Sequence, residues 1–247
     1  MSRSAPHATL TQSIAEDLGK GIVTGRFEHE GLPSEQAIAD RYGAARTITR
    51  EAIKMLAAKG LVRSRTRMGI LIEPEDRWNL LDSDVLKWLM QRPFSIDTLI
   101  EFTEFRLGAE PNAARLAAMH ATDVEKSTIC TAVQRMYDAE QGKEPGLEAD
   151  IGFHVAVLEA SRNRFCLQMR EFIAIALTYS IQRTNSIKGE HRACASDHDD
   201  VAKAILAGRP ERAERAMYEL IERALTLMHG ERVSNMSLPA APSSSDA

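Results

Sequence analysis

Residues 45–60 read ARTITREAIKMLAAKG, and this stretch decides the fold of the N-terminal part of the chain. Apolar residues recur in it at helical spacing, which predicts a helix over residues 46–59. Gly60 follows at the place where a glycine commonly ends a helix. The apolar face consists of Ala52, Ile53 and Leu56.

Two further helices are predicted before this one. Apolar residues at every fourth position predict a helix over residues 8–25. After a break at Pro33, Ser34 is a typical N-cap for a second helix over residues 35–41. A tight turn containing Gly43, a residue that easily adopts left-handed backbone, separates the second helix from the third.

A hairpin is predicted after the third helix. Residues 61–65 and 70–73 read as short strands, and residues 66–69 read as the turn between them. Three helices followed by a hairpin form a winged helix-turn-helix. We therefore expect a DNA-binding domain over residues 8–73.

The rest of the chain has only helical periods. We expect a linker and connecting helix over residues 74–94, a helical domain over 95–229 and a disordered tail rich in Ser, Pro and Ala over 230–247. Pro111 should kink its helix. The fold class is thus mainly α, with an N-terminal winged helix-turn-helix and a C-terminal all-α helical bundle. The predicted helices beyond the hairpin cover residues 80–91, 95–119, 122–139, 146–160, 163–187, 190–208 and 210–229.

The composition excludes several classes of protein. The chain has 247 residues, of which 44% are hydrophobic and 27% charged, as in globular proteins. Its longest apolar run, residues 172–177, is far shorter than the roughly 20 residues of a membrane helix. Residues 1–7 contain no apolar core of a secretion signal. Cys130, Cys166 and Cys194 are too few for a disulfide framework. We expect a cytoplasmic protein with no membrane partner.

Charge is concentrated in one segment. The net charge is −4, yet residues 41–67 contain eight basic side chains opposed only by Glu51. Such a basic segment suits phosphate groups, although charge alone would equally fit a solvated basic face.

The third helix contains the residues that would read DNA. Arg46 and Arg50 are four residues apart and therefore share one helix face. They lie in the first turns, the part of a recognition helix that meets base edges, and arginine can bind guanine through two hydrogen bonds. Thr47 and Thr49 are short enough to reach a phosphate or a thymine methyl group.

The hairpin would contribute the wing contacts. Arg65 and Arg67 flank its tip, and Gly69 removes a side chain where the wing would approach DNA. Any one of these arginines could be an ordinary surface charge, but the whole set on this scaffold indicates double-stranded operator DNA as the partner.

These motifs resemble the GntR family of bacterial transcription regulators. The resemblance rests on LPSE at residues 32–35, RTITREA at 46–52 and GLV at 60–62, and it extends over about residues 10–73. It implies DNA contacts by Arg46, Thr47, Arg50 and the wing-tip Gly69. Many members have an arginine that contacts DNA directly after the Ser-Glu pair. This chain has Gln36 there, which leaves its operator preference open.

A candidate metal site lies in the helical domain. Asp150 and His154 are four residues apart on a predicted helix, so both side chains can reach one divalent metal. His198 is the best candidate for a third ligand from another helix. By local pattern alone, such an Asp/His pair is more often a surface or capping pair.

Residues 105–118 and 150–163 resemble the FadR-type (FCD) C-terminal domain. The resemblance implies a metal, zinc or a similar ion, held by Asp150, His154 and His198. The usual fourth ligand is a histidine in the last helix, and that position is Leu220 here. Three ligands can still hold zinc with water or effector oxygens in the open positions. Alternatively, the site binds metal weakly and other groups recognise the effector.

The resemblance also implies an effector site. Arg106 is the position that would bind the effector carboxylate, for which a guanidinium is well suited. Its alternative role is a salt bridge on the helix surface with Glu104 or Glu110. Asn163 and Arg183 are further candidates for the pocket.

Residues 77–88 are similar to the same stretch of the galactonate-operon repressors, which implies a sugar acid such as D-galactonate or another aldonate. The leading hypothesis is therefore a homodimeric transcription regulator, a repressor of sugar-acid catabolism that its effector releases from the operator. One alternative is the same fold sensing a lactate-like hydroxy acid or an acyl ligand. The other is a metal-dependent enzyme, but the chain has no HExxH and no nucleophile motif, so we expect no enzymatic activity.

Overall fold

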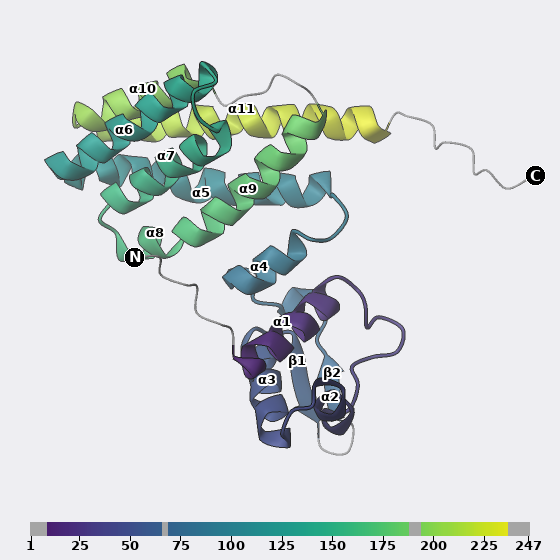
Figure 1. Ribbon diagram of the computed structural model, residues 1–247. Helices are drawn as coiled ribbons and strands as arrows, with labels where there is room; N and C mark the ends of the chain where they lie inside the picture. Colours follow the sequence, from purple (N-terminus) through teal and green to yellow (C-terminus); the bar gives the residue numbers. More distant parts are fainter. Residues whose placement is uncertain (1–8, 66–68, 188–193, 237–247) are drawn as a thin grey trace, which may run out of the picture. The chain divides into compact units, whose positions relative to one another are not determined.

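The computed structural model describes residues 9–65, 69–187 and 194–236, with the side chains of 65, 181–187 and 233–236 left out. The chain divides into two compact units between Pro93 and Phe94 (Figure 1).

The first unit is a winged helix-turn-helix, as the sequence predicts. Ser34 caps the second helix by accepting a hydrogen bond from the backbone N–H of Ala37, and Gly43 ends it in left-handed backbone. The hairpin is antiparallel and pairs Val62 with Ile72. Its elements are α1 (Leu10–Val23), α2 (Glu35–Tyr42), α3 (Arg46–Ala58), β1 (Val62–Arg65) and β2 (Gly69–Ile72).

The segment expected to be a linker packs into this first unit. It forms a 3-10 turn, η1 (Glu75–Arg77), and a helix, α4 (Ser83–Leu89). Trp88 lies in the same core as α1 and α3, where Gly19 leaves room for its ring, and its indole N–H donates to Glu16 at 2.7 Å. The connecting helix is therefore a structural part of the first unit.

The second unit is all helical, as expected from the helical periods. Its core contains many alanines, including Ala114, Ala117, Ala149 and Ala156, and small side chains allow helices to approach closely. Helix α11 packs along α5 (Figure 1). The helices are α5 (Ile96–His120), α6 (Asp123–Glu140), α7 (Gly146–Ala160), α8 (Arg164–Gln168), α9 (Arg170–Ile187), α10 (Ala195–Leu206) and α11 (Pro210–Met236).

Helix α5 contains Pro111, as the sequence predicts, and the kink expected there stays a prediction. Two expectations for this unit need revision. The helix over 163–187 is two helices that divide at Met169, where neither Gly nor Pro signals a break. Helix α11 extends into the expected tail as far as Met236, and Arg232 in this extension pairs with Asp97 at 2.9 Å.

Residues 237–247 of the expected tail lie outside the described residues. None of the helices that the structure describes is both long and apolar enough to span a bilayer.

Candidate functional site

A cleft in the first unit brings together three of the residues predicted to contact DNA, Arg46, Arg50 and Gly69. It has a volume of about 390 Å³ and joins the start of α2, the start of α3 and the wing. The recognition helix and the wing therefore present one surface, as a winged helix requires for DNA. The residues that line the cleft are Ser34, Glu35, Gln36, Arg46, Arg50, Ser64, Gly69 and Ile70.

Side chains of α2 contact Arg46 and Arg50, the two arginines predicted to read DNA. Arg46 Nε donates to Gln36 Oε1 at 2.6 Å, and Gln36 Nε2 donates in turn to Asp40 Oδ1 at 2.7 Å. Arg50 pairs with Glu35 at 3.3 Å, with 63% of the Arg50 side chain exposed. Exposed pairs of this kind contribute little, so DNA can replace them. Gln36, the residue that departs from the family pattern, therefore helps to position the side chain of Arg46.

The prediction that Thr49 contacts DNA is wrong. Its side chain is fully buried, because Thr49 shares the inward face of α3 with Ala52, Ile53 and Leu56. Thr47, two residues earlier, is exposed and stays a candidate for a phosphate contact.

The wing can be described only in part. Gly69 is exposed, and its φ of 79° lies in the left-handed region that favours glycine. The glycine is therefore explained by backbone conformation, in addition to the room it leaves for DNA. Arg67 and the side chains of Arg65 and Arg183 lie outside the described residues.

The second unit brings the three predicted metal ligands together. Asp150 and His154 lie on α7, His198 lies on α10, and all three are buried. Their candidate ligand atoms lie within 4.8 Å of one another. Asp150 Oδ1 is 3.0 Å from His198 Nε2 and 3.7 Å from His154 Nε2. The i, i+4 spacing on α7 places the first two, and the packing of α10 supplies the third.

The hydrogen bonds of His198 fit a metal ion at this centre. His198 Nδ1 lies 3.0 Å from the carbonyl oxygen of Cys194, which can only accept, so the imidazole proton is assigned to Nδ1. With His198 neutral, Nε2 has only a lone pair, and it faces Asp150 Oδ1. Both atoms are buried without a hydrogen-bond partner. Two such acceptors suit a divalent cation between them, and nitrogen and carboxylate ligands suit zinc.

Arg106 reaches the same centre from α5. It is buried, and its Nη2 lies 3.3 Å from His154 Nε2. Its Nε donates to Glu110 Oε1 at 2.5 Å, so the alternative ion pair with Glu110 does form. The expected surface location of that pair is wrong, because Glu110 is only 1% exposed. The second carboxylate oxygen of Glu110 bonds His154 Nδ1.

Both buried carboxyl groups are held in the ionised form. Burial raises the pKa of Glu110, but the charges of Arg106 and His154 and their hydrogen bonds outweigh it and lower the pKa to about 2. Burial likewise raises the pKa of Asp150, while the neighbouring His198, His154 and Arg106 lower it below its usual value.

Glu110 also belongs to this centre, although the sequence predicts it only as a salt-bridge partner of Arg106. Its spacing of four residues after Arg106 is the one local signal for a role at the centre. Leu220, at the position of the usual fourth ligand, packs partly buried against the core. Asn163 caps α8 by accepting from the N–H of Phe165 at 2.9 Å, so its effector contact stays a prediction.

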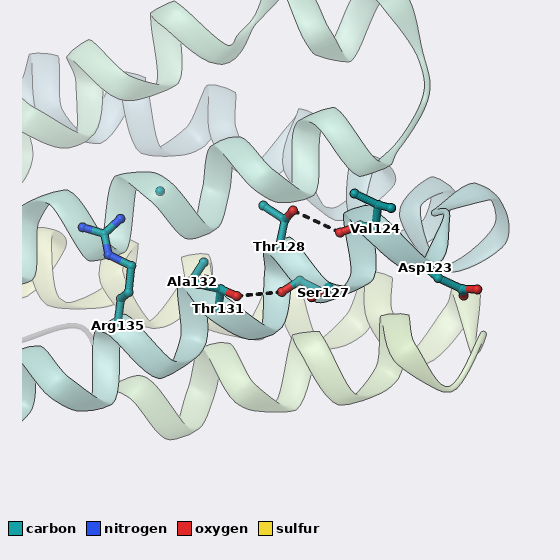
Figure 2. A pocket seen from close by; sticks show the side chains of 8 residues that line it. Asp123, Val124, Ser127, Thr128, Thr131, Ala132 and Arg135 are labelled. Atoms are coloured by element: carbon teal, nitrogen blue, oxygen red, sulfur yellow. Dashed lines mark hydrogen bonds between the residues drawn. The ribbon is translucent and has the colours of Figure 1, made fainter.

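A separate groove of about 540 Å³ runs along α6 (Figure 2). The hydroxyls of Thr128 and Thr131 donate to backbone carbonyls one turn earlier, each at 3.0 Å, and Arg135 pairs with Glu144. None of the predicted site residues lines this groove, so we assign no function to it. Its lining consists of Asp123, Val124, Ser127, Thr128, Thr131, Ala132, Arg135 and Gly152.

Comparison with known proteins identifies both units. Residues 10–72 match the family model described as bacterial regulatory proteins, gntR family, and residues 101–223 match the FCD domain. The chain is 34% identical over 174 residues to the galactonate operon transcriptional repressor of Escherichia coli (strain K12), covering 70% of this chain and 74% of that protein. It is 28% identical over 234 residues to the Exu regulon transcriptional regulator of the same organism, covering 90% and 85% respectively.

Among solved structures, one described as Lar, which controls the expression of the Listeria monocytogenes agr system, has a TM-score of 0.52 at 16% identity. The alignment covers 92% of this chain and 99% of that one, and it supports the fold alone.

Proposed function

The chain belongs to the gntR family of bacterial regulatory proteins and contains an FCD domain, and from this premise we propose that it represses genes of sugar-acid catabolism until an aldonate such as D-galactonate releases it from its operator. Family membership makes the chain a transcription regulator rather than an enzyme. The similarity to a galactonate operon repressor supports the aldonate as effector.

The observation that carries this proposal is a guanidinium beside a candidate metal centre. Arg106 offers a fork for a carboxylate, next to the three ligands Asp150, His154 and His198. A divalent ion bound there would supply positive charge and open coordination positions for oxygen atoms. A carboxylate with a neighbouring hydroxyl, as in an aldonate or another hydroxy acid, matches such a pair of groups.

We propose that the first unit reads DNA through Arg46 and Arg50, with Thr47 and the wing at Gly69 on the phosphate backbone. As a homodimer, the protein would place one recognition helix in each half of a palindromic site. An effector weakens such a complex only if it binds the free form better than the DNA-bound form.

The test measures binding of the purified protein to its own upstream DNA by fluorescence anisotropy. The complex is then titrated with D-galactonate, other aldonates and L-lactate, and release of the DNA is recorded. Release by an aldonate that a chelator abolishes would support the proposal in full. Release by L-lactate alone would replace the effector class. An Arg46→Ala variant should bind operator DNA more weakly but keep its effector, whereas Arg209→Ala, which changes an exposed arginine of the second unit, should behave like the parent.

A further inference from the structure

The proposed contacts to DNA, metal and effector leave Glu110, a buried charge among the described residues, without a function. Glu110 lies inside α5 and is 1% exposed. Both of its oxygens are engaged, one by Arg106 Nε at 2.5 Å and the other by His154 Nδ1. A buried carboxylate is costly unless it is paired, so its position between an arginine and a candidate ligand calls for an explanation.

The contact with His154 makes Glu110 a positioning residue for the metal centre. A carboxylate accepts only, so the imidazole proton lies on Nδ1, and the Nε2 lone pair lies 3.7 Å from Asp150 Oδ1 and 3.3 Å from Arg106 Nη2. This is the carboxylate–histidine arrangement that orients ligands in many metal sites. His198 is oriented in the same sense by the backbone carbonyl of Cys194. Of these two orienting groups, only Glu110 carries a charge.

The contact with Arg106 ties the same carboxylate to the proposed effector site. In the buried cluster, the carboxyl groups of Asp150 and Glu110 lie around the guanidinium of Arg106 and the two imidazoles. A divalent cation on Asp150, His154 and His198 would add two positive charges beside Arg106, which favours binding of an anion there.

We propose that Glu110 makes anion binding depend on the metal. It orients His154 toward the ion, and it holds Arg106 until the carboxylate of a ligand takes the place of Glu110. This inference rests on the proposed effector site at Arg106. It adds that metal and anion bind with positive coupling, and that the coupling passes through one named carboxylate. By linkage, zinc strengthens binding of the carboxylate by the same factor as the carboxylate strengthens binding of zinc.

The test uses full-length protein, Glu110→Gln and, as a matched control, Glu104→Gln. The control makes the same charge change at an exposed position of the same helix. Gln keeps an oxygen that can accept from His154 but removes the charge. Zinc affinity is measured by chelator competition, and binding of D-galactonate, L-lactate and acetate is measured by calorimetry with and without zinc.

We expect Glu110→Gln to bind zinc about 10- to 100-fold more weakly, as is typical when a group that orients a ligand is changed. The parent and Glu104→Gln should bind a carboxylate at least about tenfold more tightly with zinc than without it, a coupling of ordinary size. In Glu110→Gln that ratio should fall to about threefold or less, because a neutral amide holds Arg106 less strongly when zinc is absent and orients His154 less strongly when it is present.

The outcomes separate this inference from the proposed function. Unchanged zinc affinity and unchanged coupling in Glu110→Gln would overturn the inference even if D-galactonate binds. Coupling that depends on Glu110 for L-lactate or acetate, without binding of D-galactonate, would support the inference and refute the aldonate. Failure of all three carboxylates to bind the zinc-loaded parent would overturn both. Should Glu110→Gln not fold, the double variant R106Q/E110Q leaves neither partner of the ion pair charged, and its zinc affinity should fall by the same factor.

Discussion

An arginine–glutamate pair in the DNA-binding unit and another in the helical unit contain the same groups in opposite surroundings. Arg50 and Glu35 lie 3.3 Å apart at the surface, whereas Arg106 and Glu110 lie 2.5 Å apart in an alanine-rich core. The exposed pair is weak and can be exchanged for phosphates or bases. Each charge of the buried pair needs a partner of opposite charge in every state of the protein. Arg50 can therefore leave Glu35 for water at little cost, whereas Arg106 can leave Glu110 only for another anion.

The largest expected effect comes from breaking the buried pair. Arg106→Met leaves Glu110 buried without its guanidinium and should lower the free energy of unfolding by about 3–5 kcal/mol. Arg50→Met, the surface counterpart, should lower it by less than about 1 kcal/mol. Urea denaturation followed by circular dichroism measures both. Equal losses would show that the two pairs do not differ in the way their burial indicates.

Zinc should stabilise the helical unit. At a concentration a hundredfold above its dissociation constant, the ion should add about 2.7 kcal/mol to the free energy of unfolding. His198→Ala removes one of the three candidate ligands and should abolish this gain, whereas His120→Ala, an exposed histidine, should keep it. Thermal unfolding with zinc or with a chelator tests this. A gain that persists in His198→Ala would place the ion elsewhere.

The recognition arginines should affect DNA binding alone. Arg46→Ala and Arg50→Ala should each weaken operator binding by about 1–3 kcal/mol, the value of a bidentate contact with guanine. Their zinc affinity should match that of the parent, because both side chains lie in the first unit. Anisotropy on operator and on unrelated DNA distinguishes the loss of specificity from a general loss of charge. Full operator affinity in both variants would exclude α3 as the reader.

The smallest effect is expected at Gln36. Gln36→Ala removes an exposed hydrogen bond to Arg46, worth about 0.5–1.5 kcal/mol, and leaves the guanidinium free to turn. Operator affinity should therefore change by less than about tenfold, mainly at the base that Arg46 reads. A panel of operators with single substitutions measures this. A uniform change across all bases would indicate that Gln36 contacts the phosphate backbone itself.

Short-range patterns predicted much of the DNA-binding unit. The structure contains three local features that the sequence predicts: Ser34 as a helix cap, Gly43 in left-handed backbone, and three helices followed by a hairpin. The burial of Thr49, which contradicts its predicted DNA contact, is also a local feature, because its spacing to Ala52 and Ile53 places it on the apolar face of α3. The packing of Trp88 against Gly19 was not predictable locally, since the two positions are far apart in the chain.

The sequence by itself determined the winged helix-turn-helix, the helical character of the second unit and the shared face of Asp150 and His154, because helical periodicity and caps act over a few residues. Only the tertiary structure decided how the metal centre is built. Glu110 of α5 meets His154 of α7 across 44 residues of sequence, and His198 of α10 comes within 3.0 Å of Asp150 of α7. The partners and charge state of a buried polar group depend on what packing brings to it, and local sequence does not contain that information.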